Sequence, residues 1–398
     1  MRHRATAPIT PRPQPTTFRT DATDRTVRPA LATIDLDALV ANYRWLQEHG
    51  KPGRTLAVVK ADAYGHGAVQ CASALAPFVD GFAVAFLEEA LTLRKNGITA
   101  PILVLEGCLA ADEYAACCAH RLWTVVHCEP QLAWLEAHAR RGAPHPERIW
   151  VKVDSGMHRL GFAPEALSGV IARLERLAVE PRHLVWMTHL ACADQPKHPH
   201  TAAQLERFAQ ALEALPERYA QVPRSIANSA ALLAWPAAHG DWARPGIALY
   251  GANPLATEPL PAALTPVMTL RSEIIATRWI AAGEAVGYGA AFVAERATRV
   301  GVVAIGYGDG YPRTAPTGTP VAVAGHRTRL IGRVSMDLVT VDLTDLPESV
   351  GVGAAVELWG RQVLVDEVAR AVGTIGYELL CHVRRVPMRY LPATCTAC

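Results

Sequence analysis

The fold is decided by the stretch TLAVVKADAYGHG at residues 55–67, where a short apolar run ends on a lysine and a glycine-containing polar turn follows. A short apolar run rich in β-branched residues and bounded by turn residues is typical of a buried strand. Seven similar runs follow before residue 245, each ending near a polar residue. The eight runs are TLAVVK (55–60), GFAVAF (81–86), PILVLE (101–106), WTVVH (123–127), IWVKVD (149–154), LVWMTH (184–189), RSIAN (224–228) and DWAR (241–244).

Segments rich in Ala, Leu, Glu and Arg lie between these runs, and their spacing predicts helices at 87–96, 130–140, 164–177 and 202–214. Eight strand-helix units predict an α/β fold, an N-terminal (β/α)8 barrel of the TIM type. An open, doubly wound sheet is the alternative. It is disfavoured because no glycine-rich dinucleotide turn follows the first strand.

The pattern changes after residue 265, where short apolar runs are separated by Gly, Pro and Asp and few helical segments remain. This predicts a mostly-β C-terminal domain. The segment ALATIDLDAL (30–39) precedes the barrel and is a candidate for an added strand of that second domain. The predicted organisation is a disordered extension (1–29), the barrel (30–265), the β domain (266–391) and a loose tail (392–398).

Composition favours a soluble protein that acts on small molecules. The net charge of +2 leaves no electrostatic footprint for nucleic acid or an anionic membrane, and no apolar run reaches the ~20 residues of a membrane span. The nine cysteines are odd in number and scattered, which suggests a reducing compartment, the cytoplasm. Cys395 and Cys398 form a CxxC without a second pair, so we expect no metal site.

Function in such a barrel sits at the carboxyl ends of the strands. Lys60 ends the first strand, and a desolvated lysine can form a Schiff base, although a lone lysine is more often a surface residue. The pairs Asn228-Ser229 and Gly246-Ile247 follow the last two strands, where barrels commonly bind phosphate; alone they are ordinary helix-capping residues. A lysine and a phosphate cradle together indicate pyridoxal 5'-phosphate.

A series of motifs in the same order resembles the alanine racemase family. VVKADAYGHG (58–67) is similar to the cofactor-lysine motif of that family, and the resemblance covers nearly everything except the first thirty residues. It continues through VKVDSGMHRLGF (151–162), MTHLACAD (187–194), IANSAALL (226–233), RPGIALYG (244–251), VGYGAAF (286–292), IGYGDGYPR (305–313), GRVSMDLVTVDL (332–343) and TIGYELLC (374–381). The fold of that family is a (β/α)8 barrel followed by a β domain, as expected above.

The resemblance also implies roles for individual residues. Lys60 holds the cofactor and is the base on one face of the substrate α-carbon, and Tyr288 is the base on the other face, delivered by a partner subunit in a homodimer. Arg244 faces the pyridine nitrogen and is hydrogen-bonded by His189; because a guanidinium does not give up its proton, the ring nitrogen stays unprotonated. The phosphate contacts are Tyr64, Ser229, Gly246, Ile247 and Tyr377, and Asn228 also binds the cofactor.

The substrate contacts follow in the same way. Arg159 binds the cofactor ring oxygen and the substrate carboxylate, and Met336 offers its backbone N–H with Asp337 beside it. Tyr307 and Tyr377 form a gate that restricts side-chain size. In family members with a lysine at the position of Lys152, this residue can be carbamylated and bridge to Arg159; the alternative is an unmodified Lys152 paired with Asp154.

The activity implied is racemisation of L-alanine and D-alanine by a two-base mechanism, supplying D-alanine for cell-wall peptidoglycan. One alternative is a racemase of serine or another amino acid on the same fold. Another is a non-catalytic pyridoxal-phosphate-binding protein, although such proteins lack a β domain. A decarboxylase of this architecture needs a cysteine in the partner-derived loop, where VGYGAAF (286–292) offers a tyrosine. The sequence leaves a biosynthetic or catabolic role open.

Overall fold

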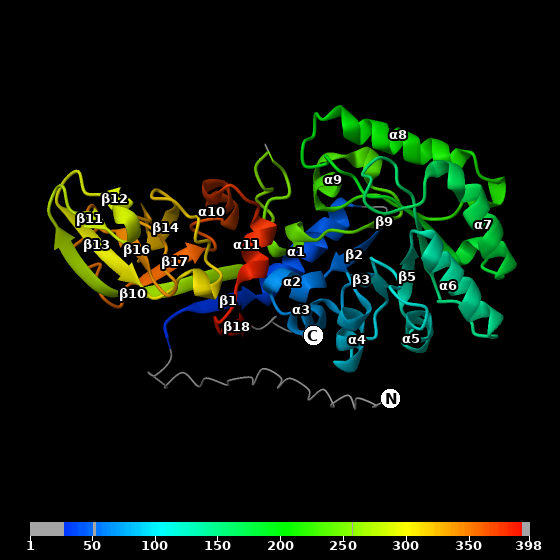
Figure 1. The fold of residues 1–398 in the computed structure, drawn as a ribbon, viewed down its shortest axis with the longest axis horizontal. Coiled ribbons are helices and arrows are strands. Elements are labelled where there is room, and N and C mark those ends of the chain that lie inside the picture. The colour runs from blue at the N-terminus through cyan, green and yellow to red at the C-terminus, as the bar shows by residue number, and fades with distance from the viewer. Residues whose placement is uncertain (1–27, 51–52, 257, 392–398) are drawn as a thin grey trace, which may run out of the picture.

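A computed structural model gives the structure of the chain and describes residues 28–50, 53–256 and 258–391. Figure 1 shows two parts along the long axis of the molecule, a strand-helix barrel at one end and a β domain at the other. The predictions for residues 1–27 and for the tail at 392–398, with its CxxC, lie outside the described residues.

The barrel consists of eight parallel strands, as the sequence predicts. Neighbouring strands pair in chain order from β2 to β8, β2 also pairs with β9, and a parallel bridge between Asn228 and Arg244 completes the ring. The strands are β2 (Arg54–Val58), β3 (Gly81–Val84), β4 (Ile102–Val104), β5 (Trp123–Val126), β6 (Ile149–Lys152), β7 (Leu184–Met187), β8 (Arg224–Ser225) and β9 (Trp242–Ala243).

Helices surround these strands, and their apolar faces point inward. In α7, Leu167, Val170, Ile171 and Leu174 are buried at the spacing of one helical face. The four predicted helices correspond to α4, α6, α7 and α8, and residues 164–166 form a separate 3-10 turn. The helices of this part are α1 (Leu36–His49), α2 (Lys60–Gly65), α3 (Ala68–Leu75), α4 (Leu87–Lys95), α5 (Glu113–Ala119), α6 (Glu129–Arg140), α7 (Leu167–Arg176), α8 (Pro199–Glu213) and α9 (Ser229–Ala234).

The second domain is built on the long strand β10 (Met268–Ile280), whose first half buries every second residue. It pairs with β1 (Leu31–Asp35), β13 and β17. Residues 31–35 therefore belong to the sheet of the second domain, although the predicted boundaries count them with the barrel. This agrees with the candidate strand that the sequence offers at 30–39. The other elements are β11 (Ala285–Val286), β12 (Phe292–Val293), β13 (Thr298–Val303), β14 (Pro320–Val323), β15 (His326–Arg329), β16 (Val339–Asp342), β17 (Ala355–Trp359), α10 (Val365–Val372), α11 (Gly376–His382) and β18 (Met388–Leu391).

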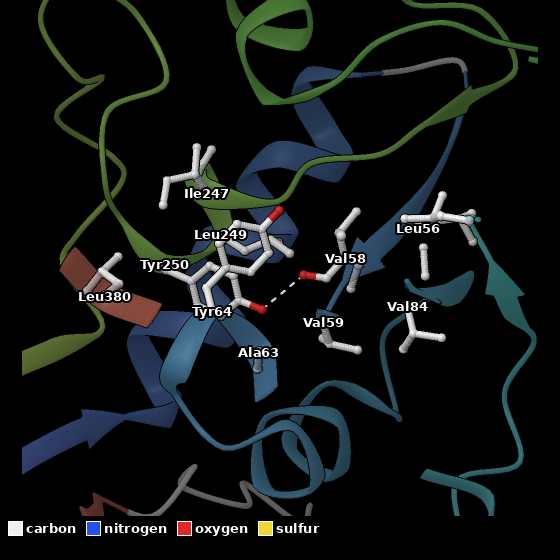
Figure 2. Close-up of a cluster of buried hydrophobic side chains, with 14 of the residues drawn as sticks. Leu56, Val58, Val59, Ala63, Tyr64, Val84, Ile247, Leu249, Tyr250 and Leu380 are labelled. Carbon is white, nitrogen blue, oxygen red and sulfur yellow. Dashed lines mark hydrogen bonds between the residues drawn. The ribbon is translucent and has the colours of Figure 1, made fainter. Parts of the chain in front are cut away.

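The two parts share one continuous hydrophobic core. Helix α11 comes from the C-terminal part of the chain but packs against α2, directly after the first barrel strand. Figure 2 shows the junction, where Tyr64, Tyr250 and Leu380 meet and the Tyr250 hydroxyl donates to the Val58 carbonyl at 2.9 Å. Among the described residues, no helix has the length and the apolar composition needed to cross a membrane.

Candidate active site

A cavity of about 390 Å³ lies at the carboxyl ends of the barrel strands and is closed on one side by α11. All ten residues predicted to contact the cofactor line it: Lys60, Tyr64, Arg159, His189, Asn228, Ser229, Arg244, Gly246, Ile247 and Tyr377. Lys152 lines it as well. Six further lining residues had not been predicted, namely Val58, Ala61, Leu105, Glu106, Met187 and Cys381.

The backbone after Lys60 makes a left-handed turn. The four residues from Ala61 to Tyr64 have φ values of 52° or 53°, in a region that costs a non-glycine residue about 1–2 kcal/mol. The turn is held by specific partners: the Glu89 carboxylate accepts from the Ala61 N–H at 2.7 Å, and the Asp62 carboxylate accepts from the Ala68 N–H at 2.7 Å. Backbone strain that is offset by specific hydrogen bonds is typical of functional sites. Here both Lys60, which precedes the turn, and Tyr64, which ends it, line the cavity.

One end of the cavity has the donors that a phosphate group needs. Gly246 lies so close to the Tyr64 hydroxyl that a Cβ atom at position 246 would stand 2.3 Å from it. The Ser229 hydroxyl accepts from the Gly246 N–H at 2.8 Å, next to the start of α9. Burial raises the pKa of Tyr64 and of Tyr377, so both phenols stay protonated and can donate. Backbone N–H groups, a helix start and neutral hydroxyls together suit a phosphate dianion.

Arg244 also lines the cavity and is buried. Its guanidinium donates to the Thr188 carbonyl at 2.7 Å and to the Ser225 hydroxyl, and it lies 3.5 Å from His189 Nδ1. Burial lowers the pKa of Arg244 to about 9, which leaves it charged at neutral pH. Burial, and next the charge of Arg244, hold the pKa of His189 well below its usual value, so the imidazole is neutral and can accept. The charged guanidinium of Arg244, which also lines the cavity, can donate to a ring nitrogen but cannot supply it with a proton.

Lys152 is the second lysine of the cavity. Burial lowers its pKa to about 8, opposed by the nearby carboxylate of Glu106. The predicted alternative, a pair between Lys152 and Asp154, is wrong. Asp154 instead accepts from the N–H groups of residues 156–158 at 2.9 to 3.0 Å and faces the His158 ring at 3.1 Å. The three N–H groups and the ring occupy the Asp154 carboxylate, and Asp154 is not among the cavity residues.

The remaining predicted residues lie outside this cavity, on the surface of the β domain. Tyr288 is 71% exposed, Met336 52% and Tyr307 38%. Tyr307 and Met336 belong to one surface, because the Tyr307 N–H donates to the carbonyl of Ser335, the residue before Met336, at 3.0 Å. The chain does not bring Tyr288, Tyr307, Met336 or Asp337 to its own cavity.

Two positioning residues were missed by the sequence reading. Gln204, buried in α8, donates to the His189 carbonyl at 3.1 Å, and its carbonyl accepts from the Ala191 N–H at 2.9 Å. Glu89 lies in α4 and holds the turn after Lys60. Both lie inside helices, where no sequence signal marks them. Glu106 could have been found, since it ends the run PILVLE as Lys60 ends TLAVVK.

Comparison with known proteins points to the same family over most of the chain. The profile of the alanine racemase N-terminal domain matches residues 34–254, and that of the C-terminal domain matches residues 267–390. An alanine racemase of Azoarcus sp. strain BH72 is 56% identical over 92% of this chain and 99% of its own length. A catabolic alanine racemase of Pseudomonas putida is 51% identical, again over 92% and 99%.

Solved structures agree. The crystal structure of the biosynthetic alanine racemase from Pseudomonas aeruginosa superposes with a TM-score of 0.84 at 50% identity, covering 92% of this chain and all of that chain. An alanine racemase from Bartonella henselae, solved with covalently bound pyridoxal phosphate, has a TM-score of 0.82 at 31% identity, with the same coverage. These matches confirm the fold class that the sequence predicts.

Proposed function

The chain belongs to the alanine racemase family, and from this premise we propose that it interconverts L-alanine and D-alanine with pyridoxal 5'-phosphate bound through Lys60. One observation carries the proposal. A single cavity at the carboxyl ends of the barrel strands joins Lys60, a group of phosphate donors and a buried arginine.

The residues present fit this cofactor. The absence of a side chain at Gly246 lets the Tyr64 hydroxyl pack against its backbone, where a Cβ atom would stand 2.3 Å from it, and the Ser229 hydroxyl accepts from the Gly246 N–H. Tyr64, Asn228, Ser229, Gly246, Ile247 and Tyr377 would hold the phosphate, and Arg244 would face the ring nitrogen. When bound, the cofactor would supply an electron sink that makes the proton on the substrate α-carbon removable. The Arg244 guanidinium keeps its protons, so the ring nitrogen would stay unprotonated, which would weaken that withdrawal and disfavour side reactions.

Racemisation removes a proton from one face of the α-carbon and returns one to the other, so it needs two bases. The Lys60 amine moves the proton on one face. For the other face we propose Tyr288 of the partner subunit, because Tyr288 is 71% exposed and absent from the cavity of its own chain. A head-to-tail homodimer would place this tyrosine at the neighbouring barrel mouth.

We further propose that Arg159 binds the substrate carboxylate, with the Met336 N–H and Asp337 contributed across the dimer. Tyr307, with Tyr377, would limit the size of the substrate side chain. Lys152 is suited to carbamylation, because a lysine with a pKa of about 8 keeps a reactive fraction of neutral amine. Its nitrogen would add to carbon dioxide and release a proton to solvent, and the resulting anion would pair with Arg159.

The physiological role we propose is supply of D-alanine for peptidoglycan, in the cytoplasm. The seven described cysteines are all free thiols, which supports a reducing compartment. The related proteins carry both biosynthetic and catabolic descriptions, so the sequence relationship is compatible with either role.

A chiral assay of the purified protein against a panel of L-amino acids tests the activity. We expect D-alanine to form fastest, whereas faster formation of D-serine would favour the related racemase. Borohydride reduction followed by peptide mapping should place the pyridoxyl group on Lys60. A protein that carries the group on Lys60 but racemises nothing would be a cofactor-binding protein, and the proposed activity would be wrong.

A further inference from the structure

A buried carboxylate lies directly behind the surface that carries Tyr307. The Asp309 side chain is fully buried, in the 3-10 turn Tyr307–Asp309. One of its oxygens lies 2.5 Å from Arg28 Nη2 and 3.8 Å from Arg385 Nε, and the other accepts from the Gly306 N–H at 3.0 Å. A buried charge is costly unless it is paired, so the position of this turn depends on both arginines.

Arg385 connects the same turn to the neighbouring loop. Its Nη2 donates to the Asp337 carboxylate at 2.9 Å. The guanidinium also fills the space under Gly308, where a Cβ atom would stand 2.6 Å from Nη1. The backbone of Arg385 has a φ of 54°, an uncommon conformation for a residue with a side chain. The Gly308 N–H donates to the Met336 carbonyl at 2.8 Å, so the two loops are bound together in the backbone as well.

Arg28 reaches this network from a part of the chain that lies ahead of residue 34, where the family profile begins. Arg28 is one of the last two residues of the segment 1–29, which the sequence predicts to be disordered, but in the structure it forms an ion pair with a buried carboxylate. Its guanidinium is 31% exposed, whereas the carboxylate it binds is buried, so this pair is better shielded from solvent than an ordinary surface ion pair.

We propose that Arg28 and Arg385 are positioning residues, which act through Asp309 to fix the surface formed by Tyr307, Met336 and Asp337. The inference rests on the proposed function in one respect, that this surface contacts substrate. The network then determines how tightly alanine binds and how well a larger substrate is rejected. The cofactor end of the barrel does not depend on it, because no residue of the network lines that cavity.

The test compares Arg28→Ala with Arg296→Ala. Arg296 makes an ion pair of the same length, 2.5 Å, with Asp345 in the same domain, but the Asp345 carboxylate is 74% exposed. Hydrogen exchange of peptides covering residues 304–311 and 333–338 should become about tenfold faster in Arg28→Ala and stay unchanged in Arg296→Ala. Exchange of residues 56–67 and the affinity for pyridoxal phosphate should not change. Arg28→Lys keeps the charge without the guanidinium, so its exchange rates in residues 304–311 and 333–338 should lie between those of Arg28→Ala and Arg296→Ala.

The kinetic part of the test uses the same variants. In Arg28→Ala the KM for alanine should rise more than kcat falls, and the preference for alanine over serine should decrease. A merely destabilised protein would instead lose active molecules at constant KM. Unchanged exchange in both loops would overturn the proposal whether or not the protein racemises alanine. Faster exchange with the same KM and the same preference would show that the network does not position the substrate surface. A wild-type protein without racemase activity would refute the proposed function but leave the exchange result valid.

Discussion

Replacing Gly246 with alanine adds one methyl group and tests whether the region around Gly246 binds the phosphate. The added Cβ would lie 2.3 Å from the Tyr64 hydroxyl, so this oxygen would have to retreat by more than 1 Å to restore an ordinary contact of at least 3.4 Å. Tyr64 cannot do so freely. Its ring lies between Tyr250 and Tyr377, at centroid distances of 5.0 and 6.0 Å, and only 8% of the residue is exposed.

The size of the effect follows from this confinement. Overpacking of a rigid site costs about 1–3 kcal/mol, and we expect Gly246→Ala to lower the free energy of unfolding of the cofactor-free protein by that amount. If the phosphate is held by the Tyr64 hydroxyl in its present position, displacing that hydroxyl should lower the affinity for pyridoxal phosphate by a similar free energy, a factor of about 5 to 150.

Gly169→Ala is the matched control. Gly169 lies exposed in α7 with no atom within 4 Å of the position of an added Cβ, so alanine should stabilise the helix by about 0.5–1 kcal/mol. Denaturant unfolding gives the stabilities, and fluorescence titration of the cofactor-free protein gives the affinities. The reasoning is refuted if Gly246→Ala behaves like Gly169→Ala in both measurements.

Three other outcomes test separate parts of the account. Arg244→Glu, which could accept from a protonated ring nitrogen, should increase transamination, measured as pyruvate formed from alanine; an unchanged product ratio would show that Arg244 does not contact the ring. The gate assigned to Tyr307 and Tyr377 predicts that alanine turns over best, serine weakly and lysine hardly at all, so a comparable kcat/KM for lysine would contradict it. Burial lowers the pKa of His66 to about 4. As the pH falls below about 6.5, the unfolded chain therefore binds a proton that the folded protein does not yet bind. The free energy of unfolding should fall by up to about 3 kcal/mol between pH 6.5 and pH 4. His66→Asn should lack this part of the pH dependence, and equal acid slopes for the two proteins in denaturant titrations would disprove it.

The sequence predicts the fold well because the barrel strands are short apolar runs that end at polar residues. Lys60 illustrates how far this reading reaches: its place at a strand end is visible in the sequence, but the left-handed turn behind it is not. That turn is held by Glu89 of α4, which accepts from the Ala61 N–H, and by Asp62 of the turn, which accepts from the Ala68 N–H at the start of α3. Such contacts depend on how helices pack, and no local pattern encodes them.

The same limit applies to charged pairs. Lys152 and Asp154 are two residues apart in the sequence, and this spacing suggests an ion pair. In the structure the Asp154 carboxylate accepts instead from the N–H groups of residues 156–158. Arg28 and Asp309 are 281 residues apart, and their ion pair could not be predicted without the three-dimensional structure. Tyr288 shows the remaining gap, because its proposed role depends on a second copy of the chain.

The most direct test of the central claim, two bases contributed by two subunits, is a complementation measurement. Lys60→Ala and Tyr288→Phe chains should each be nearly inactive, and mixing them by denaturation and refolding should restore activity. Under random pairing half of the dimers are mixed and each holds one intact site, so we expect about a quarter of the wild-type activity per total chain. If the mixture stays inactive while tagged pull-down shows that mixed dimers have formed, Tyr288 does not act across the dimer and the account of a shared site is wrong.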